Sequence, residues 1–198
     1  MDYIVLMAGT GIPGDSILNL QGNLIAKASG TNDSLIFYSG KLRERSIQIV
    51  LNENDLDIMR KKLIASYLLF LSETPNYIMK QLNITEKDSL TTIGFYATNW
   101  MKYFLSYDPR PILEKIKIPV LALNGTTDLQ VPYKENLSAI ENALIKAKNK
   151  NYSIVELPGL NHLFQSSATG SPMQYSLNKE TFNEKAMNII AEWILQIE

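Results

Sequence analysis

An aspartate and the only histidine of the chain each follow a predicted strand, and together they could perform acid–base chemistry. Asp128 follows an apolar run at residues 120–123, and His162 follows a second run at residues 152–157. Loops at the carboxyl ends of neighbouring parallel strands converge on one edge of a sheet, so these two side chains can meet. A carboxylate that binds one imidazole nitrogen fixes the tautomer and leaves the other nitrogen as a general base. Asp128 and His162 are therefore the predicted catalytic residues.

Each of these two residues also has an ordinary structural interpretation. Asp128 could be a turn residue before a helix, and His162 could be an unremarkable loop histidine. Their occurrence together, each after its own strand and in the order acid then histidine, favours a functional pair.

Three serines close to His162 in the sequence are candidate nucleophiles, namely Ser166, Ser167 and Ser171. A nucleophilic serine needs a strained turn between a strand and a helix, with hydrogen-bond donors aimed at the developing oxyanion. A loop serine offers neither, so we interpret all three as polar loop residues. The chain contains no G-x-S-x-G motif, and no nucleophile is assigned within it.

A glycine-rich segment, GTGIPG at residues 9–14, fits the G-x-G-x-x-G pattern and follows a predicted strand. A dinucleotide-binding unit would continue into a second apolar strand that ends in Asp or Glu about 20 residues further on. Residues 24–33 are too polar for that strand. The glycines are better explained as a turn that leads out of the sheet, and dinucleotide binding is the weaker alternative.

The elements that must position these residues are three parallel strands, predicted at residues 3–8, 120–123 and 152–157. The first two runs are apolar on both faces, which is typical of fully buried strands. The third contains Ser153 and Glu156 and is expected at an edge of the sheet.

Two helices are predicted to accompany these strands. Pro132 suits the first turn of a helix between the second and third strands, and residues 182–197 form an amphipathic pattern at the C-terminal end. The apolar positions of the two helices are Leu137, Ile140, Leu144 and Ala147, then Phe182, Ala186, Ile189, Ile190, Trp193 and Ile197. The order strand, helix, strand, helix is typical of a doubly wound α/β sheet.

Residues 15–105 interrupt this alternation and are predicted to be an inserted helical cap or lid. The α/β core would then comprise residues 1–14 and 106–198. The most apolar run, residues 63–71, is expected to be a buried helix, since it is far shorter than the ~20 residues that cross a bilayer. Helix breaks are expected at Gly30, Gly40, Pro75 and residues 83–85.

Composition excludes several classes of function. The chain has no cysteine and one histidine, which argues against a zinc site and against a metal-dependent mechanism. Its 19 basic and 20 acidic residues nearly cancel, and the basic clusters are short, so nucleic acid is not an expected partner. Neither a cofactor nor a membrane partner is predicted.

Three segments of the chain resemble the α/β-hydrolase superfamily. Residues 107–128, YDPRPILEKIKIPVLALNGTTD, are similar to the entry into its seventh strand and its acid loop, and PGLNH at residues 158–162 resembles its histidine loop. Residues 4–14 resemble the sixth strand and its exit in capped esterase-like and serine-aminopeptidase-like members. The resemblance implies a partial α/β-hydrolase fold, the C-terminal half alone, with about three parallel strands, flanking helices and a helical cap.

The activity that this resemblance implies is hydrolysis of a small carboxylic ester or amide through an acyl-enzyme. His162 would accept the proton of a serine, and Asp128 would hold His162. Because the nucleophile elbow precedes the sixth strand in the family, the chain is expected to lack its nucleophile and to be inactive alone. A signal peptide would precede the missing half as well, so the cellular compartment is left open.

A non-catalytic role is the alternative function. Without a neighbouring nucleophile strand, the apolar strand from Tyr3 to Ala8 would have an unpaired edge. Such edges pair with other strands. This interpretation predicts an interaction module that forms a homodimer or a strand-swapped assembly.

Overall fold

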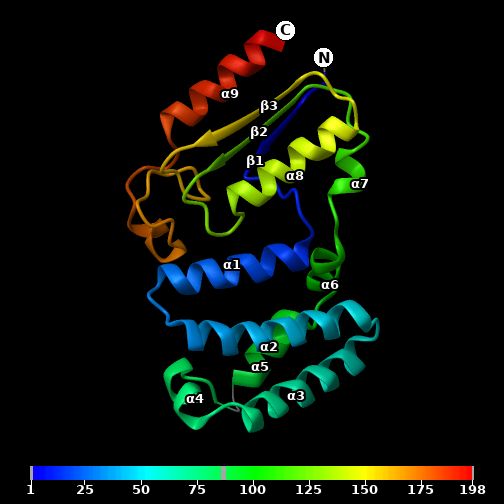
Figure 1. Ribbon diagram of the computed structural model, residues 1–198, viewed down its shortest axis with the longest axis vertical. Helices are drawn as coiled ribbons and strands as arrows, with labels where there is room; N and C mark the ends of the chain where they lie inside the picture. Colours follow the sequence, from blue (N-terminus) through cyan, green and yellow to red (C-terminus); the bar gives the residue numbers. More distant parts are fainter. Residues whose placement is uncertain (1, 86–87, 198) are drawn as a thin grey trace. The chain divides into compact units, whose positions relative to one another are not determined.

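The computed structural model describes residues 2–85 and 88–197, which fall into two units. One unit contains the sheet and consists of two chain segments, one that ends at Ala28 and one that begins at Asp108 (Figure 1). The other unit, Ser29–Tyr107, has only helices among its described regular elements. The sequence pattern suggested an insertion at residues 15–105, whereas the contacts group residues 15–28 with the sheet.

The sheet unit is built on three parallel strands, β1 (Ile4–Met7), β2 (Val120–Gly125) and β3 (Tyr152–Leu157), which lie in that order. The predicted mixed α/β class and the three-strand parallel sheet are thus confirmed. β2 is buried along its whole length, and β3 lies at an edge as expected. The expectation of full burial was wrong for the first strand, because β1 forms the other edge and its Met7 is 46% exposed.

Two helices cover the two faces of the sheet, α8 (Tyr133–Lys146) and α9 (Glu184–Ile197) (Figure 1). Alternate residues of a strand point to opposite faces, so Val120 and Ala122 pack with α8 while Leu121 and Leu123 pack with α9. The predicted apolar stripes of both helices provide these contacts. Helix α1 (Gly14–Ala28), the short α7 (Arg110–Leu113) and the 3-10 helix η1 (Pro172–Leu177) complete the unit.

The start of α9 differs from the sequence prediction by two residues. Phe182 lies before the helix instead of in it, and its ring stacks on Phe164 at a centroid distance of 5.2 Å. The side chain still joins the core below α9, so the periodic pattern identified its burial correctly although its backbone is not helical.

The second unit consists of α2 (Asp33–Asn52), α3 (Leu56–Glu73), α4 (Asn76–Leu82), α5 (Asp88–Tyr96) and α6 (Asn99–Ser106). Side-chain caps set where three of these helices begin: Asn32 accepts from Leu35 N, Asp55 from Asp57 N and Ile58 N, and Thr98 from Met101 N.

Most of the predicted helix breaks lie between helices of this unit. Gly30 precedes α2 with a left-handed φ of 76°, Pro75 precedes α4, and Asn83 follows α4 with φ 51°. Gly40 was predicted wrongly, because it lies inside α2. Glycine costs about 1 kcal/mol in a helix interior, and the packing of the other residues of α2 outweighs that cost.

The apolar run at residues 63–71 lies in α3, but only one face of this helix is buried. Leu63, Tyr67 and Phe70 are at most 3% exposed, whereas Leu68 is 44% and Leu69 is 51% exposed. The expectation of a buried helix is therefore correct for one face and wrong for the other.

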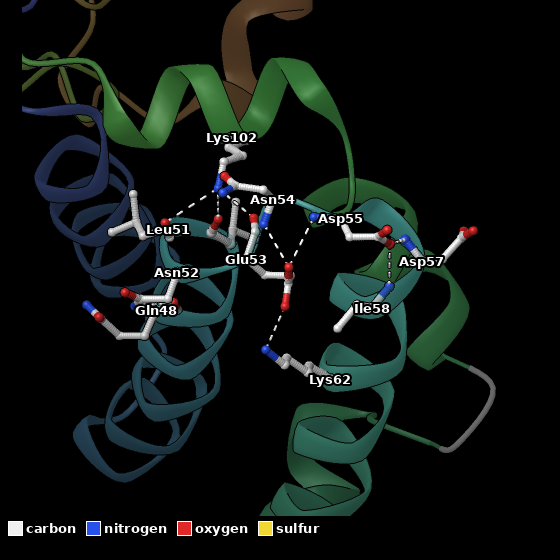
Figure 2. Close-up of polar contacts among 11 residues, drawn as sticks. Gln48, Leu51, Asn52, Glu53, Asn54, Asp55, Asp57, Ile58, Lys62 and Lys102 are labelled. Carbon is white, nitrogen blue, oxygen red and sulfur yellow. Dashed lines mark hydrogen bonds and ion pairs between the residues drawn. The ribbon is translucent and has the colours of Figure 1, made fainter.

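A polar network holds the end of α2 against the start of α3 and against α6 (Figure 2). The Lys102 ammonium group donates to the carbonyls of Val50 and Glu53 at 3.0 and 2.5 Å. The last carbonyls of a helix lack intrahelical donors, so Lys102 satisfies groups that α2 leaves unpaired. The Glu53 carboxylate accepts from Lys62 at 2.6 Å.

Candidate acid–base site

The acid loop begins where β2 ends, at Gly125, and it buries the Asp128 carboxylate completely. One carboxylate oxygen, Oδ1, accepts from the backbone N–H groups of Gln130 and Val131 at 2.8 and 2.9 Å. These bonds orient the carboxylate and leave Oδ2 for another donor. A buried carboxylate without such donors would be strongly unfavourable.

The histidine loop is a tight turn that the Asn161 side chain organises. The Asn161 oxygen accepts from Leu163 N at 2.9 Å and from Gln165 N at 3.0 Å, and Phe164 N donates to the Asn161 carbonyl at 2.9 Å. His162 is therefore the second residue of a turn whose ends are fixed.

Phe164 adopts a left-handed backbone conformation, with φ 58°, two residues after His162. This conformation is unfavourable for a non-glycine residue. The ring is 3% exposed and stacks on Phe182, so burial of the ring stabilises the strained turn.

Asp128 and His162 meet as the sequence predicted. His162 Nδ1 lies 2.9 Å from Asp128 Oδ2, and the exposed fractions of the two side chains are 28% and 0%. If the neutral ring carries its proton on Nδ1, the proton is donated to Asp128 and Nε2 keeps a lone pair. The buried carboxylate then also stabilises the imidazolium that forms when Nε2 accepts a proton.

Two glycines allow the loops to approach closely enough for this contact. A Cβ on Gly125 would lie 1.9 Å from the Leu160 carbonyl oxygen, and a Cβ on Gly170 would lie 1.7 Å from that of Thr127. Gly170 also has φ 67°. The Thr127 N–H donates to the Leu160 carbonyl at 3.1 Å, which joins the acid loop to the histidine loop. The backbone itself therefore sets the distance between Asp128 and His162.

Tyr175 and Gln130 lie beside the pair and were not identified from the sequence. The Gln130 amide donates to the Tyr175 hydroxyl at 3.1 Å, and Gln130 Oε1 accepts from Gln21 of α1 at 3.4 Å. No motif contains these residues. Gln130 lies two positions after Asp128, which is the only signal that could have drawn attention to it.

Two of the three candidate serines, Ser166 and Ser167, have hydroxyl groups that accept hydrogen bonds from neighbouring segments. The Ser166 hydroxyl accepts from Asn183 at 3.3 Å, and the Ser167 hydroxyl accepts from Gly170 N at 2.9 Å. None of the hydrogen bonds among residues 2–85 and 88–197 joins a serine hydroxyl to His162. Ser166 and Ser167 line a pocket of about 290 Å³ together with Asn161, Ala168, Gln174, Leu177 and Asn178.

The glycine-rich segment packs against α8. Gly11 N donates to the buried Asn136 side chain at 2.8 Å, and a Cβ on Gly11 would lie 2.3 Å from the Asn136 carbonyl oxygen. The motif does open a helix, α1, but a second helix follows instead of a strand. Asp15 occupies the first turn of α1, where a phosphate would meet its negative charge. These contacts favour the interpretation as a packing turn.

In the part of the chain that the structure describes, no three His, Cys, Asp or Glu side chains are grouped so that they could hold a metal ion. None of the helices in this part combines the length and the apolar character that a membrane span needs.

Comparisons of the chain with protein-family models, with curated proteins and with solved structures found no match of any of the three kinds.

Proposed function

We propose that the chain carries the acid and the base of a serine hydrolase active site of the α/β-hydrolase type, and that the serine nucleophile lies outside these 198 residues. The observation that supports it best is the contact between His162 Nδ1 and Asp128 Oδ2 at 2.9 Å, in which Asp128 is fully buried and its other oxygen is held by two backbone N–H groups. The resemblance of residues 107–128 and 158–162 to the hydrolase acid and histidine loops gives the pair its proposed role.

The proposed reaction is hydrolysis of a carboxylic ester or amide. His162 Nε2 accepts the proton of the serine hydroxyl while the serine oxygen attacks the carbonyl carbon, and it then gives that proton to the leaving alcohol or amine. Water deacylates the enzyme by the same proton transfers in the second step. Asp128 holds the imidazole in its productive orientation and stabilises the imidazolium through both steps.

The edge of β1 is where the nucleophile would be supplied. Among the described residues β1 pairs with β2 alone, and the unpaired N–H and C=O groups of an edge strand can pair with a further strand. In the family that the chain resembles, the strand beside this one ends in the nucleophile elbow. A further parallel strand on β1 would bring such an elbow to the sheet edge that carries Asp128 and His162.

Covalent labelling with a fluorophosphonate, read as intact mass, tests this proposal. We expect no adduct on the 198-residue chain, and one serine adduct on the protein as its own cells make it, with any further segment or subunit. In that native form, Asp128→Asn and His162→Gln should each slow labelling by about a thousandfold. Asp57→Asn, which changes an exposed acid of α3, is the matched control.

Two results would contradict the proposal. One is labelling of the native form that His162→Gln leaves unchanged, since His162 would then not be the base. The other is labelling of a serine within the 198 residues, since the nucleophile would then lie inside the chain.

The open edge of β1 favours one second candidate, a module that dimerises through this strand. Tyr3 and Met7 at the two ends of the edge are 40% and 46% exposed. Sedimentation velocity should then show a dimer that Met7→Lys converts to a monomer, because lysine on an edge strand opposes pairing. A monomer at high concentration in the unmodified chain would contradict this candidate.

A further inference from the structure

The helical unit contains a pocket of about 390 Å³ between α2 and α5. Protein pockets that hold small molecules measure about 300–1,000 Å³, so this one has room for a ligand. Residues three and four apart on a helix share a face, and each of the two helices supplies such a set. The lining side chains include Ser39, Leu42 and Arg43 of α2 and Thr92, Phe95 and Tyr96 of α5. The pocket is therefore formed within one unit of the chain.

Most of the pocket wall is apolar. Leu42, Ile84 and Phe95 contribute to it, and Phe95 is 51% exposed to solvent. The Ser39 hydroxyl donates to the Ile36 carbonyl at 3.1 Å, so its proton is already bound within α2. Covering apolar surface of this kind with the hydrocarbon part of a ligand is favourable.

Arg43 places a positive charge in this mainly apolar wall. Its side chain is half-buried, and burial is the main cause that lowers the pKa of the guanidinium group. The charge has thus lost part of its hydration, which a carboxylate in contact with it would replace. A guanidinium group carries five N–H donors, so it can bind a carboxylate while it keeps other contacts.

Tyr96 provides a second donor near Arg43. Burial raises the pKa of its hydroxyl to about 12, although the positive charge of Arg43 lowers it. The hydroxyl therefore keeps its proton at neutral pH. Among residues 2–85 and 88–197, no hydrogen bond engages this hydroxyl. It can accordingly donate to an acceptor that lies in the pocket.

We propose that this pocket binds a small aliphatic carboxylate, whose anionic end contacts the Arg43 guanidinium and whose chain lies against Leu42 and Phe95. A neutral molecule of the same length would cover the same apolar surface, but it would not compensate the partly desolvated charge. The pocket lies in the helical unit and the acid–base pair lies in the sheet unit, so this proposal does not rest on the proposed function.

Titration of the 198-residue chain with octanoate and, separately, with 1-octanol tests the proposal through ¹H–¹⁵N correlation spectra. We expect saturable shifts that are largest for the amides of residues 39–43 and 91–96. Octanoate should bind at least about tenfold more tightly than 1-octanol, as expected for one hydrogen bond to a charged group. This comparison uses the unmodified chain and needs no variant to fold.

Arg43→Met removes the charge and keeps an apolar stem in the pocket. It should weaken octanoate binding by about 10- to 100-fold and leave 1-octanol binding nearly unchanged. Arg60→Met is the matched control, because Arg60 is exposed on α3 and does not line the pocket. It should leave the affinities for both molecules unchanged.

Three results would overturn the proposal. They are no saturable shift at millimolar octanoate, equal affinities of the unmodified chain for octanoate and 1-octanol, and shifts confined to the sheet unit. Unchanged octanoate binding in folded Arg43→Met would overturn it as well. None of these measurements depends on labelling by a fluorophosphonate, so failure of this proposal and failure of the proposed function are told apart.

Discussion

The loops at the sheet edge and the ends of the helices in the second unit are held by different kinds of contact. At the sheet edge, glycine backbone lies directly against a neighbouring loop, and a Cβ on Gly125 would approach the Leu160 carbonyl oxygen to 1.9 Å. In the helical unit, flexible charged side chains reach the helix ends, as Arg45 within α2 does at 2.6 Å from Glu73, the last residue of α3. The first arrangement leaves no space for an added carbon atom, whereas the second is made by side chains that can change rotamer.

The central strand of the sheet differs in burial from the helices of the second unit. Every residue of β2 is buried, so any added atom there must displace a neighbour. The helical unit exposes large apolar side chains, including Leu90 at 75% and Trp100 at 66%. The comparison teaches that close backbone approaches, at Gly125 and Gly170, lie beside the loops of Asp128 and His162, where a change of geometry would matter most to the proposed chemistry.

The largest expected effect is on stability, when one methyl group is added to a glycine in each unit and the two changes in the free energy of unfolding are compared. Gly125→Ala should lower the free energy of unfolding of the sheet unit by about 3 kcal/mol, because the Cβ meets backbone that cannot move away cheaply. Gly94→Ala is the matched change in α5, where a Cβ would meet nothing within 4 Å. It should stabilise the helical unit by about 0.5–1 kcal/mol.

Hydrogen exchange followed by mass spectrometry tests both variants, because it measures the protection of backbone amides in peptides of each unit separately. Equal losses of protection in both units after Gly125→Ala would contradict this comparison, because the added methyl group would then not destabilise the sheet unit in particular.

A smaller effect is expected from removal of the Lys102 ammonium group in the helical unit. Lys102→Met deprives the carbonyls of Val50 and Glu53 of their donor, at a cost of about 1.5 kcal/mol. Exchange in the last turn of α2 should therefore accelerate about tenfold. Lys61→Met, on the exposed side of α3, is the control and should change exchange little. Unchanged protection in Lys102→Met would mean that water replaces the ammonium group without cost.

The smallest effect is a loss of stability of the helical unit in acid. The hydrogen bond from Lys62, followed by the backbone bond from Asp55, lowers the pKa of Glu53 from 4.5 to about 2. A carboxyl whose folded-state pKa is depressed stabilises the fold above its ordinary pKa, and this contribution is lost as the pH falls from 4.5 towards 2. The effect is small because the Lys62 side chain is 53% exposed to solvent.

Thermal unfolding between pH 6 and about pH 2.5 tests this contribution, a range that brackets the ordinary and the lowered pKa of a glutamate. Glu53→Gln should show a shallower decrease of melting temperature with acid than the unmodified chain, and Glu44→Gln, an exposed residue of α2, should not. Parallel profiles for all three proteins would contradict the role of Glu53.

Local sequence pattern was enough to predict the elements that position the pair. The strand at residues 152–157 was predicted with the bounds that β3 has, and Leu137, Ile140 and Leu144 face the core as their spacing required. Asp128 and His162 could be paired before any coordinates because parallel strands bring the loops at their carboxyl ends to one edge. Each of these inferences uses periodicity or order along the chain.

Tertiary structure alone decided the contacts that fix the geometry of the site. Tyr175 reaches Gln130 across 45 residues of chain, and Gly125 is required because the Leu160 carbonyl passes next to it. Gly40 continues a helix that its own preference would have ended, and α3 buries one face of a run that is apolar almost throughout. Periodicity reports which side chains share a face, whereas these features depend on which distant backbone arrives at that face, and that is settled only when the whole core packs.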